Sequence, residues 1–215
     1  MPVIPAKLDE GFPNGFAHYP NYFSPDQQAR LIKAVKDGVA LAPFFVPRMP
    51  RTGQPLSVVM SNFGPLGWVT DKDRGYRYDP VHPKTQKPWP AMPQALLDLW
   101  DDVTDFPERP EACLINWYRE GNKMGAHIDN DEQEARAPVV SVSLGDPAMF
   151  RMGGPSRGGV TKGLKLLSGD VVVMGGASRF CYHSVSKIFY GHSALVPKGG
   201  RINLTLRRVK PLGAM

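Results

Sequence analysis

The sequence predicts a mainly β chain with flanking helices (α+β), built around a jelly roll or a related barrel. Three observations predict this fold class. Short β-type runs separated by turn residues fill the chain from residue 112 onward. Glycine pairs at 153–154, 158–159, 175–176 and 199–200 mark tight corners between these runs, as is typical of jelly rolls and related barrels. Two segments before residue 112 have the apolar spacing of helices.

The first helix is expected to begin at Ser24, after a stretch from residue 1 to about 23 that looks extended. Ser24 has the position of an N-cap, Pro25 that of the first helical residue, and Gln27 that of the capping-box partner. Its expected apolar face consists of Leu31, Ile32, Val35 and Val39. A second helix is expected to begin near Pro93, with an apolar face made of Leu96, Leu97, Trp100 and Val103.

The strands of the barrel are expected to be short, because Gly and Pro total 44 of the 215 residues and favour frequent turns. The expected strands are Cys113–Tyr118, Val139–Leu144, Ala148–Met152, Leu164–Leu167, Val171–Met174, Cys181–Val185 and Ile202–Arg208. A length of 215 residues and 42% hydrophobic content suit one domain, 1–215, with a single core.

Residues 43–93 form a distinct segment between the two helices. The segment holds ten of the 22 prolines, which rules out long regular structure through most of it. Seven cations and three anions lie in it, interleaved with Trp68, Tyr76, Tyr78 and Trp89. Cations for phosphates and aromatic rings for bases are what a single-stranded or flipped nucleotide needs. The alternative is a proline-rich surface flap whose aromatic residues pack back onto the core.

The overall charge of the chain is also consistent with binding to a nucleic acid. A formal net charge of +6 and an isoelectric point near 9.4 suggest a polyanionic partner, although a merely basic protein would have the same charge. The two cysteines, Cys113 and Cys181, each lie in an apolar run, which is typical of buried free thiols in a reducing compartment. The sequence has no apolar core of a signal peptide and no run of membrane-spanning length, so a cytoplasmic protein is expected.

The most specific chemical pattern is His127-Ile128-Asp129, followed by His183. On a strand, residues i and i+2 point to the same face, so His127 and Asp129 can reach one metal ion, with His183 arriving from a distant strand. Two imidazoles and one carboxylate form the facial triad that suits non-haem Fe(II) and leaves coordination positions open. Of the other histidines, His18 and His82 lie in proline-rich loops, and His192 is interpreted as structural or exposed.

Two arginines near the C-terminus strengthen the case for iron. Arg201, Asn203 and Arg207 fall on one strand face, and the two guanidinium groups are suitable partners for the carboxylates of a small dicarboxylate. A solvent-facing edge strand with alternating polar residues is the alternative. Asn116 and Tyr118 show the same i, i+2 relation on another strand. A zinc ion with three protein ligands could instead activate water for hydrolysis, but a zinc hydrolase would have no particular need for the arginines.

Further motifs support a family assignment. They are Met60–Gly64, Gly67–Trp68, Gly75–Tyr76, Lys87–Pro93, Cys113–Tyr118, His127–Glu132, Arg136–Gly145, Gly169–Gly176 and Arg201–Arg207. In this order they resemble the AlkB family of Fe(II)/2-oxoglutarate dioxygenases, enzymes of nucleic-acid dealkylation repair. The resemblance covers roughly residues 55–208.

The resemblance implies a double-stranded β-helix catalytic core over residues 112–208 and a nucleotide-recognition lid over residues 43–93. The implied iron ligands are His127, Asp129 and His183. The implied 2-oxoglutarate residues are Asn116, Tyr118, Arg201, Asn203 and Arg207. The implied substrate residues are Trp68, Tyr76, Asp131 and Arg157, with Asp131 facing the damaged base.

The function implied by the resemblance is oxidative demethylation that uses Fe(II), 2-oxoglutarate and O2 and releases formaldehyde, succinate and CO2. The expected substrates are 1-methyladenine and 3-methylcytosine, preferably in single-stranded DNA, with action at the bacterial nucleoid and no membrane or obligate protein partner. Duplex DNA with a flipped base, or RNA and tRNA, are alternative substrates. A non-catalytic basic nucleic-acid-binding module is the alternative from a different class.

Overall fold

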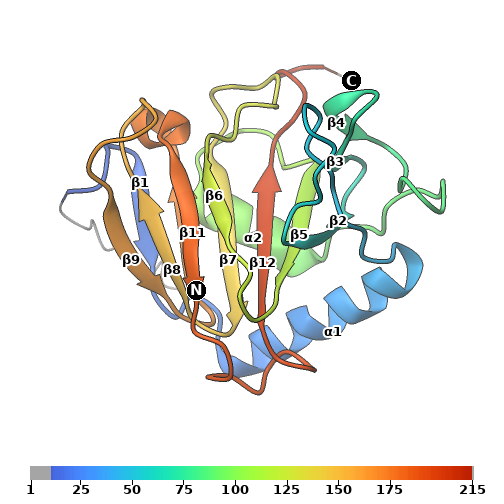
Figure 1. The fold of residues 1–215 in the computed structure, drawn as a ribbon, viewed down its shortest axis with the longest axis horizontal. Coiled ribbons are helices and arrows are strands. Elements are labelled where there is room, and N and C mark those ends of the chain that lie inside the picture. Colours follow the sequence, from blue (N-terminus) through green and yellow to red (C-terminus); the bar gives the residue numbers. More distant parts are fainter. Residues whose placement is uncertain (1–10, 215) are drawn as a thin grey trace.

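The computed structural model describes residues 11–214. In this range the chain folds into antiparallel sheets with two α-helices and one short 3-10 helix (Figure 1). The elements in chain order are β1 (Phe16–Tyr19), α1 (Pro25–Leu41), β2 (Val59–Phe63), β3 (Gly67–Asp71), β4 (Gly75–Asp79), α2 (Gln94–Val103), β5 (Ala112–Tyr118), β6 (Met124–His127), β7 (Val139–Gly145), β8 (Ala148–Met152), β9 (Lys162–Leu166), β10 (Val171–Met174), η1 (Gly176–Phe180), β11 (His183–Ile188) and β12 (Arg201–Arg207).

Two sheets pack face to face and form the body of the molecule. The major sheet has the order β1-β10-β7-β12-β5-β2, and the minor sheet has the order β6-β11-β8-β9. A cluster of buried side chains joins them, in which Val139 and Val172 of the major sheet meet Phe150 and Met152 of the minor sheet. The predicted jelly-roll architecture is therefore confirmed, with many sequence-distant strands adjacent in each sheet.

Successive side chains of β12 point to opposite faces of the major sheet, so one face is apolar and the other can carry polar groups. Ile202, Leu204 and Leu206 join the core cluster on the helix side of the major sheet. Arg201 and Asn203 have the opposite parity and line a cavity on the side that faces the minor sheet. β12 lies between β7 and β5, and all seven of its residues are buried. The alternative of a solvent-facing edge strand is therefore wrong.

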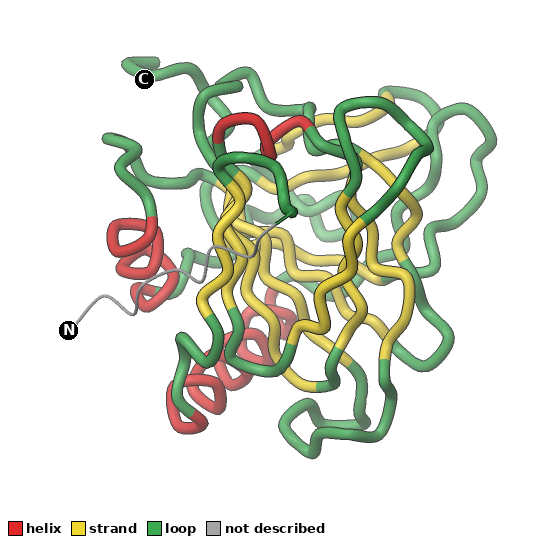
Figure 2. Tube along the Cα trace, turned by 90° about the vertical axis from the view of Figure 1, so that its left-hand side faces the viewer, coloured by secondary structure: helices red, strands yellow, loops and turns green. Residues whose placement is uncertain are grey.

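Both α-helices cover the outer face of the major sheet, to the left of and below the strands in Figure 2. Ser24 caps α1 with the predicted capping box, in which the Ser24 backbone N–H donates to the Gln27 side chain at 2.8 Å. Leu31 and Val35 of α1 are buried, and α2 buries Leu96, Leu99 and Trp100 in the same cluster. Neither of these two helices covers the minor sheet.

The segment 43–93 contains more regular structure than its prolines suggest. Its first strand, β2, pairs with β5 and is the edge of the major sheet. β3 and β4 form a separate two-stranded hairpin. Trp89 packs at the base of this hairpin, where its indole N–H donates to the Asp79 carbonyl oxygen at 2.8 Å. The part of the segment that stands apart from the core sheet is thus the β3–β4 hairpin with its adjoining loops.

Most predicted strands occur within two residues of their expected bounds, and β8 and β10 have the expected bounds. Two predictions near the N-terminus need correction or fall outside the description. His18 lies on β1 and is buried beside Asp170, with His18 Nε2 and Asp170 Oδ2 3.1 Å apart, so its assignment to a loop was wrong. The expected extended stretch begins in residues 1–10, which lie outside the described residues.

The remaining composition-based expectations concern burial. Cys113 and Cys181 are both buried free thiols, as predicted. His192 is exposed, as predicted, whereas His82 is completely buried in its loop. Within residues 11–214, each helix is too short or too polar to cross a membrane.

Candidate active site

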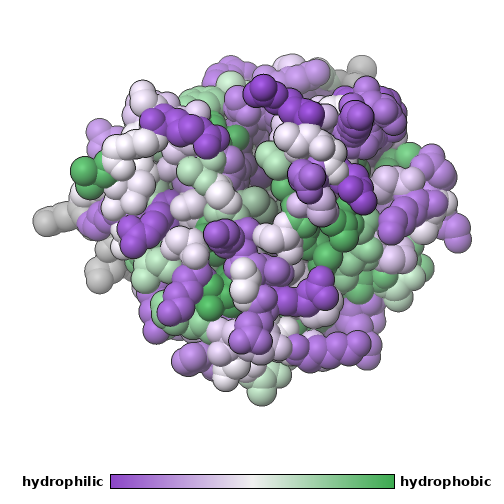
Figure 3. Space-filling model, viewed as in Figure 1, coloured by the Kyte–Doolittle hydropathy of each residue, from purple (hydrophilic) through white to green (hydrophobic). Residues whose placement is uncertain are grey.

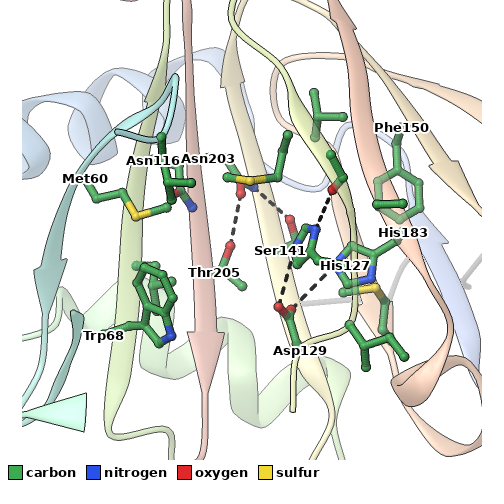
Figure 4. Close-up of a pocket in the computed structure, with 18 of the residues that line it drawn as sticks. Met60, Trp68, Asn116, His127, Asp129, Ser141, Phe150, His183, Asn203 and Thr205 are labelled. Carbon is green, nitrogen blue, oxygen red and sulfur yellow. Dashed lines mark hydrogen bonds and ion pairs between the residues drawn. The ribbon is translucent and has the colours of Figure 1, made fainter. Parts of the chain in front are cut away.

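One cavity of about 480 Å³ opens between the two sheets beneath the β3–β4 hairpin. Figure 4 shows its interior, with His127, Asp129 and His183 directed toward one another. All twelve residues that the sequence nominated for a site line this cavity: Trp68, Tyr76, Asn116, Tyr118, His127, Asp129, Asp131, Arg157, His183, Arg201, Asn203 and Arg207.

The two histidines face each other across a strand pair. His127 is the last residue of β6 and His183 is the first of β11, and the two are direct cross-strand partners with ring centroids 4.4 Å apart. Asp129 follows just beyond the end of β6, so it reaches the histidines from a loop and not from the expected strand. The potential ligand atoms of the three residues all lie within 4.8 Å of one another.

Backbone carbonyls orient both imidazoles toward a common point. His127 Nδ1 lies 2.9 Å from the Gly125 carbonyl oxygen, and His183 Nδ1 lies 3.2 Å from the Cys181 carbonyl oxygen. Because a carbonyl oxygen only accepts, each Nδ1 must carry the proton, which leaves each Nε2 lone pair free for a metal. The two Nε2 atoms approach the Asp129 carboxylate at 3.6 and 3.7 Å. The donor set fits a divalent transition metal.

The charge state of the site suits metal binding at neutral pH. Burial lowers the pKa of His183 to about 4, so its imidazole is neutral at pH 7, as a metal ligand must be. Burial alone would raise the pKa of Asp129. The Arg207 guanidinium and then the two imidazoles lower it by more than burial raises it, so the pKa of Asp129 is below its ordinary value. Asp129 is therefore an anion at neutral pH.

Arg207 belongs to a buried ionic network that the sequence did not predict. Its NH2 group lies 2.7 Å from Asp129 Oδ1, and its NH1 group lies 2.8 Å from Glu132 Oε1. Glu132 also binds Arg179 at 2.7 Å and accepts a hydrogen bond from the Tyr78 hydroxyl on β4. The network thus connects the β3–β4 hairpin to the metal-ligand candidates. Arg179 lies on η1, and no local signal in the sequence identifies its role.

Arg201 lies in the same cavity, but it forms no ion pair with a carboxylate among residues 11–214. It is 1% exposed, and its NH2 group donates to the Ser143 hydroxyl at 3.0 Å. Its Nε and NH1 atoms are buried and have no hydrogen-bond partner in the part of the chain that the structure describes. Burial lowers the pKa of Arg201. A guanidinium group buried with free donors is an incomplete site, and a carboxylate would complete it.

Neighbouring polar groups differ in how well they are satisfied. The Asn203 amide donates to the Ser141 hydroxyl at 2.8 Å and accepts from Thr205, so most of its capacity is used. Asn116 Oδ1 is buried and accepts no hydrogen bond from any described residue. The ring of Tyr118 lies 5.4 Å from the Arg201 guanidinium, and burial raises the pKa of its hydroxyl to about 12. Tyr118 is therefore a neutral hydrogen-bond donor at physiological pH.

The mouth of the cavity combines flat rings with opposite charges. Trp68 on β3 and Tyr76 on β4 stack with centroids 5.6 Å apart, and Tyr76 is half exposed. The Trp68 indole N–H donates to Asp131 Oδ2 at 2.8 Å. Arg157, in the loop between β8 and β9, donates to the Ala126 carbonyl oxygen at 3.1 Å. A flat cationic group could stack on a ring here and face a carboxylate at its edge.

Comparisons with known proteins agree with this geometry. The model of the 2OG-Fe(II) oxygenase superfamily matches residues 15–207. The chain is 49% identical to "Alpha-ketoglutarate-dependent dioxygenase AlkB homolog" of Caulobacter vibrioides, covering 91% of this chain and 88% of the relative. It is 44% identical to "Alpha-ketoglutarate-dependent dioxygenase AlkB" of Escherichia coli K12, covering 83% of each chain. It is 33% identical to "tRNA demethylase abh1" of Schizosaccharomyces pombe, covering 74% of this chain and 57% of the relative.

A solved structure extends the similarity to three dimensions. "The structure of OsALKBH1" superposes with a TM-score of 0.80 at 28% sequence identity. The match covers 95% of this chain and all of that chain. The likeness therefore includes both sheets and is not confined to the cavity.

Proposed function

Because the chain belongs to the AlkB family of the 2OG-Fe(II) oxygenase superfamily, we propose that it demethylates 1-methyladenine and 3-methylcytosine in nucleic acid, preferably in single-stranded DNA. The enzyme is an α-ketoglutarate-dependent dioxygenase, and its cofactor and co-substrates are Fe(II), 2-oxoglutarate and O2. The products of the proposed reaction are the unmodified base, formaldehyde, succinate and CO2. The buried free cysteines support a cytoplasmic location.

The observation that carries the proposal is the placement of Arg201 and its unsatisfied donors in the same cavity as His127, Asp129 and His183. The three ligand candidates would hold the iron. Arg201 would bind one carboxylate of 2-oxoglutarate with its free Nε and NH1 groups. When bound, the iron and its co-substrate supply the oxidising power that hydroxylates a methyl carbon on a base nitrogen. The resulting hydroxymethyl group leaves as formaldehyde.

Arg207 would have a different part from Arg201. It already pairs with Asp129 and Glu132, so its charge is compensated before any ligand arrives. We assign Arg207 to the second carboxylate end of 2-oxoglutarate, with Asn116, Tyr118 and Asn203 as hydrogen-bonding groups around it. The free Asn116 Oδ1 and the neutral Tyr118 hydroxyl have the capacity for such bonds.

Lesion recognition would occur at the mouth. Methylation of a Watson–Crick nitrogen makes the base cationic and weakens its pairing, so it flips out more readily. Trp68 would stack on the ring of the flipped base, and Asp131, held by the Trp68 N–H, would favour the cation over the neutral normal base. Tyr76 and Arg157 would contact the adjoining nucleotide, with the β3–β4 hairpin as the lid.

The test uses enzyme loaded anaerobically with Fe(II) and 2-oxoglutarate, then exposed to O2 with a single-stranded oligonucleotide that carries one 1-methyladenine. Loss of one CH2 unit from the oligonucleotide mass, dependent on 2-oxoglutarate, is the expected result. His183→Ala should abolish it, and His192→Ala, which removes an exposed imidazole, should not. Succinate release without a mass change would disprove the substrate, and no turnover by iron-loaded enzyme would favour a binding module.

The similarity to a protein named as a tRNA demethylase supports RNA as a second candidate substrate. The same lesion placed in a ribo-oligonucleotide of identical sequence separates the two. A higher kcat/KM for the DNA form supports the first proposal. A higher value for the RNA form would replace it with the second.

A further inference from the structure

The outer face of the minor sheet carries a row of cations and is not covered by either helix. On β8, Phe150 and Met152 are buried between the sheets, whereas Arg151 is exposed on the opposite face. Lys165 on β9 and Lys187 on β11 are also exposed. Among residues 11–214, neither lysine nor Arg151 forms an ion pair with a carboxylate, so their positive charges are uncompensated by neighbours.

The two lysines share one position in the sheet. Lys165 and Lys187 are both cross-strand partners of Met149, one from each side of β8. Their Nζ atoms lie 4.7 and 4.9 Å from the centre of the same ring, that of Phe189. Two ammonium groups held near one ring repel each other, and an anion bound between them would offset that repulsion. Protection of an edge strand explains Lys165 on β9, but Lys187 is on an interior strand and has no such role.

The sequence around these residues is almost free of acids. From residue 147 to residue 200 there are seven lysines and arginines and a single acid, Asp170. Asp170 is buried just before β10 of the other sheet, where it contacts His18 on β1. This segment is therefore more basic than the average for the chain.

Part of the opposite side of the molecule, the region of α2, is acidic. Residues 94–111, which contain α2, hold six acids and one arginine. α2 packs on the outer face of the major sheet, away from the minor sheet. The acidic α2 region thus lies on the other side of the molecule from the cations of the minor sheet, and a polyanion would be repelled from α2 and attracted to the minor-sheet face.

The row of cations continues to the mouth of the cavity. Arg157 lies in the loop that joins β8 to β9, beside Ala126, and lines the cavity. Arg151 comes next along β8, and Met149 with its two flanking lysines follows two residues further. A strand advances roughly 6.6 Å over two residues, so the cations are arranged in steps from the mouth across the sheet. On the side seen in Figure 3, hydrophilic residues cover most of the surface, with smaller hydrophobic areas between them.

We propose that this face, defined by Arg151, Lys165 and Lys187, binds the phosphate backbone of the substrate strand on one side of the flipped nucleotide. The inference rests on the proposed function and extends it, because it places a second contact region outside the cavity. Contacts of this kind add affinity without sequence preference. They also predict that the substrate must extend beyond the lesion to bind tightly.

The experiment compares Lys165→Gln/Lys187→Gln with wild-type enzyme. Affinity for a lesion-bearing single-stranded oligonucleotide is measured between about 50 and 200 mM salt. Loss of two phosphate contacts should weaken binding and reduce the slope of log affinity against log salt by about 1.4, at roughly 0.7 per contact for a single strand. The matched control, Arg30→Gln/Lys36→Gln, removes the same charge from exposed positions on α1 and should leave the slope unchanged.

Unchanged thermal unfolding and unchanged 2-oxoglutarate binding verify that the double variant is folded. An unaltered slope, or an equal loss in the α1 control, would overturn the proposal while leaving repair by the wild-type enzyme intact. Lost binding to anionic lipid vesicles, with unchanged oligonucleotide affinity, would also overturn it. Failure of the wild-type enzyme to repair any oligonucleotide would instead disprove the proposed function, so the two failures are distinguishable.

Discussion

The indole N–H of Trp68 donates to the Asp131 carboxylate at 2.8 Å and joins the β3–β4 hairpin to the loop that follows the metal-ligand candidates. The bond fixes the ring that would stack on a base and the carboxylate that would face its edge. One side chain therefore determines the position of both groups of the proposed recognition site.

Trp68→Phe should keep an aromatic surface and release Asp131. A hydrogen bond to a charged group contributes about 1.5–3 kcal/mol, so we expect KM for a 1-methyladenine oligonucleotide to rise roughly tenfold or more, with little change in kcat. Steady-state kinetics measure both constants.

Asp131→Ala should reduce the preference for methylated over unmethylated competitor, and an unchanged preference would show that the carboxylate does not recognise the cation.

Arg201→Met should separate stability from ligand binding. The substitution removes a buried charge that forms no ion pair within residues 11–214, and burial of an unpaired charge is costly. We expect the ligand-free variant to be at least as stable as wild type in urea, and 2-oxoglutarate to raise the Tm of wild type alone. A variant that is still stabilised by 2-oxoglutarate would refute the assigned role. Lys36→Met, at an exposed position, is the control for loss of charge.

Glu132→Gln should weaken the whole ionic network. Glu132 binds both Arg179 and Arg207, and loss of its charge leaves two buried guanidinium groups undercompensated. Breaking a buried ion pair from one side costs about 3–5 kcal/mol, so the free energy of unfolding should fall by roughly that amount in urea titrations. Glu120→Gln, at an exposed position, should have no comparable effect. Equal stability of the two variants would show that the network does not hold the fold.

Glu134 should make stability depend on pH in the acidic range. Hydrogen bonds from the Arg136 side chain, and then from the Leu212 backbone N–H, lower the pKa of Glu134 to about 2. A folded-state pKa below that of the unfolded chain, about 4.3, adds stability that is present above that value and is lost as the pH falls toward 2. Urea unfolding at several pH values should show a smaller decline for Glu134→Gln than for wild type. An identical decline would contradict the assignment.

The strands of the core were predictable because their patterns are local. β8 and β10 are bounded by turn residues and consist of apolar residues with few interruptions, so their bounds follow from the sequence. The β3–β4 hairpin was not predicted, because prolines dominate the sequence around it. Its two strands also pair only with each other among the described strands and belong to neither large sheet. The Arg179–Glu132 pair spans 47 residues and exists only in the folded chain, so no spacing rule could locate it.

The site residues were predictable to a different extent. His127 and Asp129 share a short spacing, and the Arg201–Arg207 run has a strict alternation that a central strand preserves. The spacing of residues could not predict that the two arginines differ in their ion pairs. Among the described residues, Arg207 has two acidic partners and Arg201 has none, and this difference depends on the loop after β6, which brings Asp129 and Glu132 near Arg207.

The cross-strand pair His127–His183 has a consequence for the integrity of the sheet itself. β6 has four residues, lies at the edge of the minor sheet, and among the described strands pairs only with β11. A short, half-exposed edge strand of this kind opens more easily than the centre of a fold. An ion bound by both imidazoles would link β6 to β11 and stabilise this edge strand against local unfolding. Enzyme made in an iron-starved cell should therefore be the form that proteases cut first, near Lys123, and iron supply would control how long the protein survives as well as whether it works.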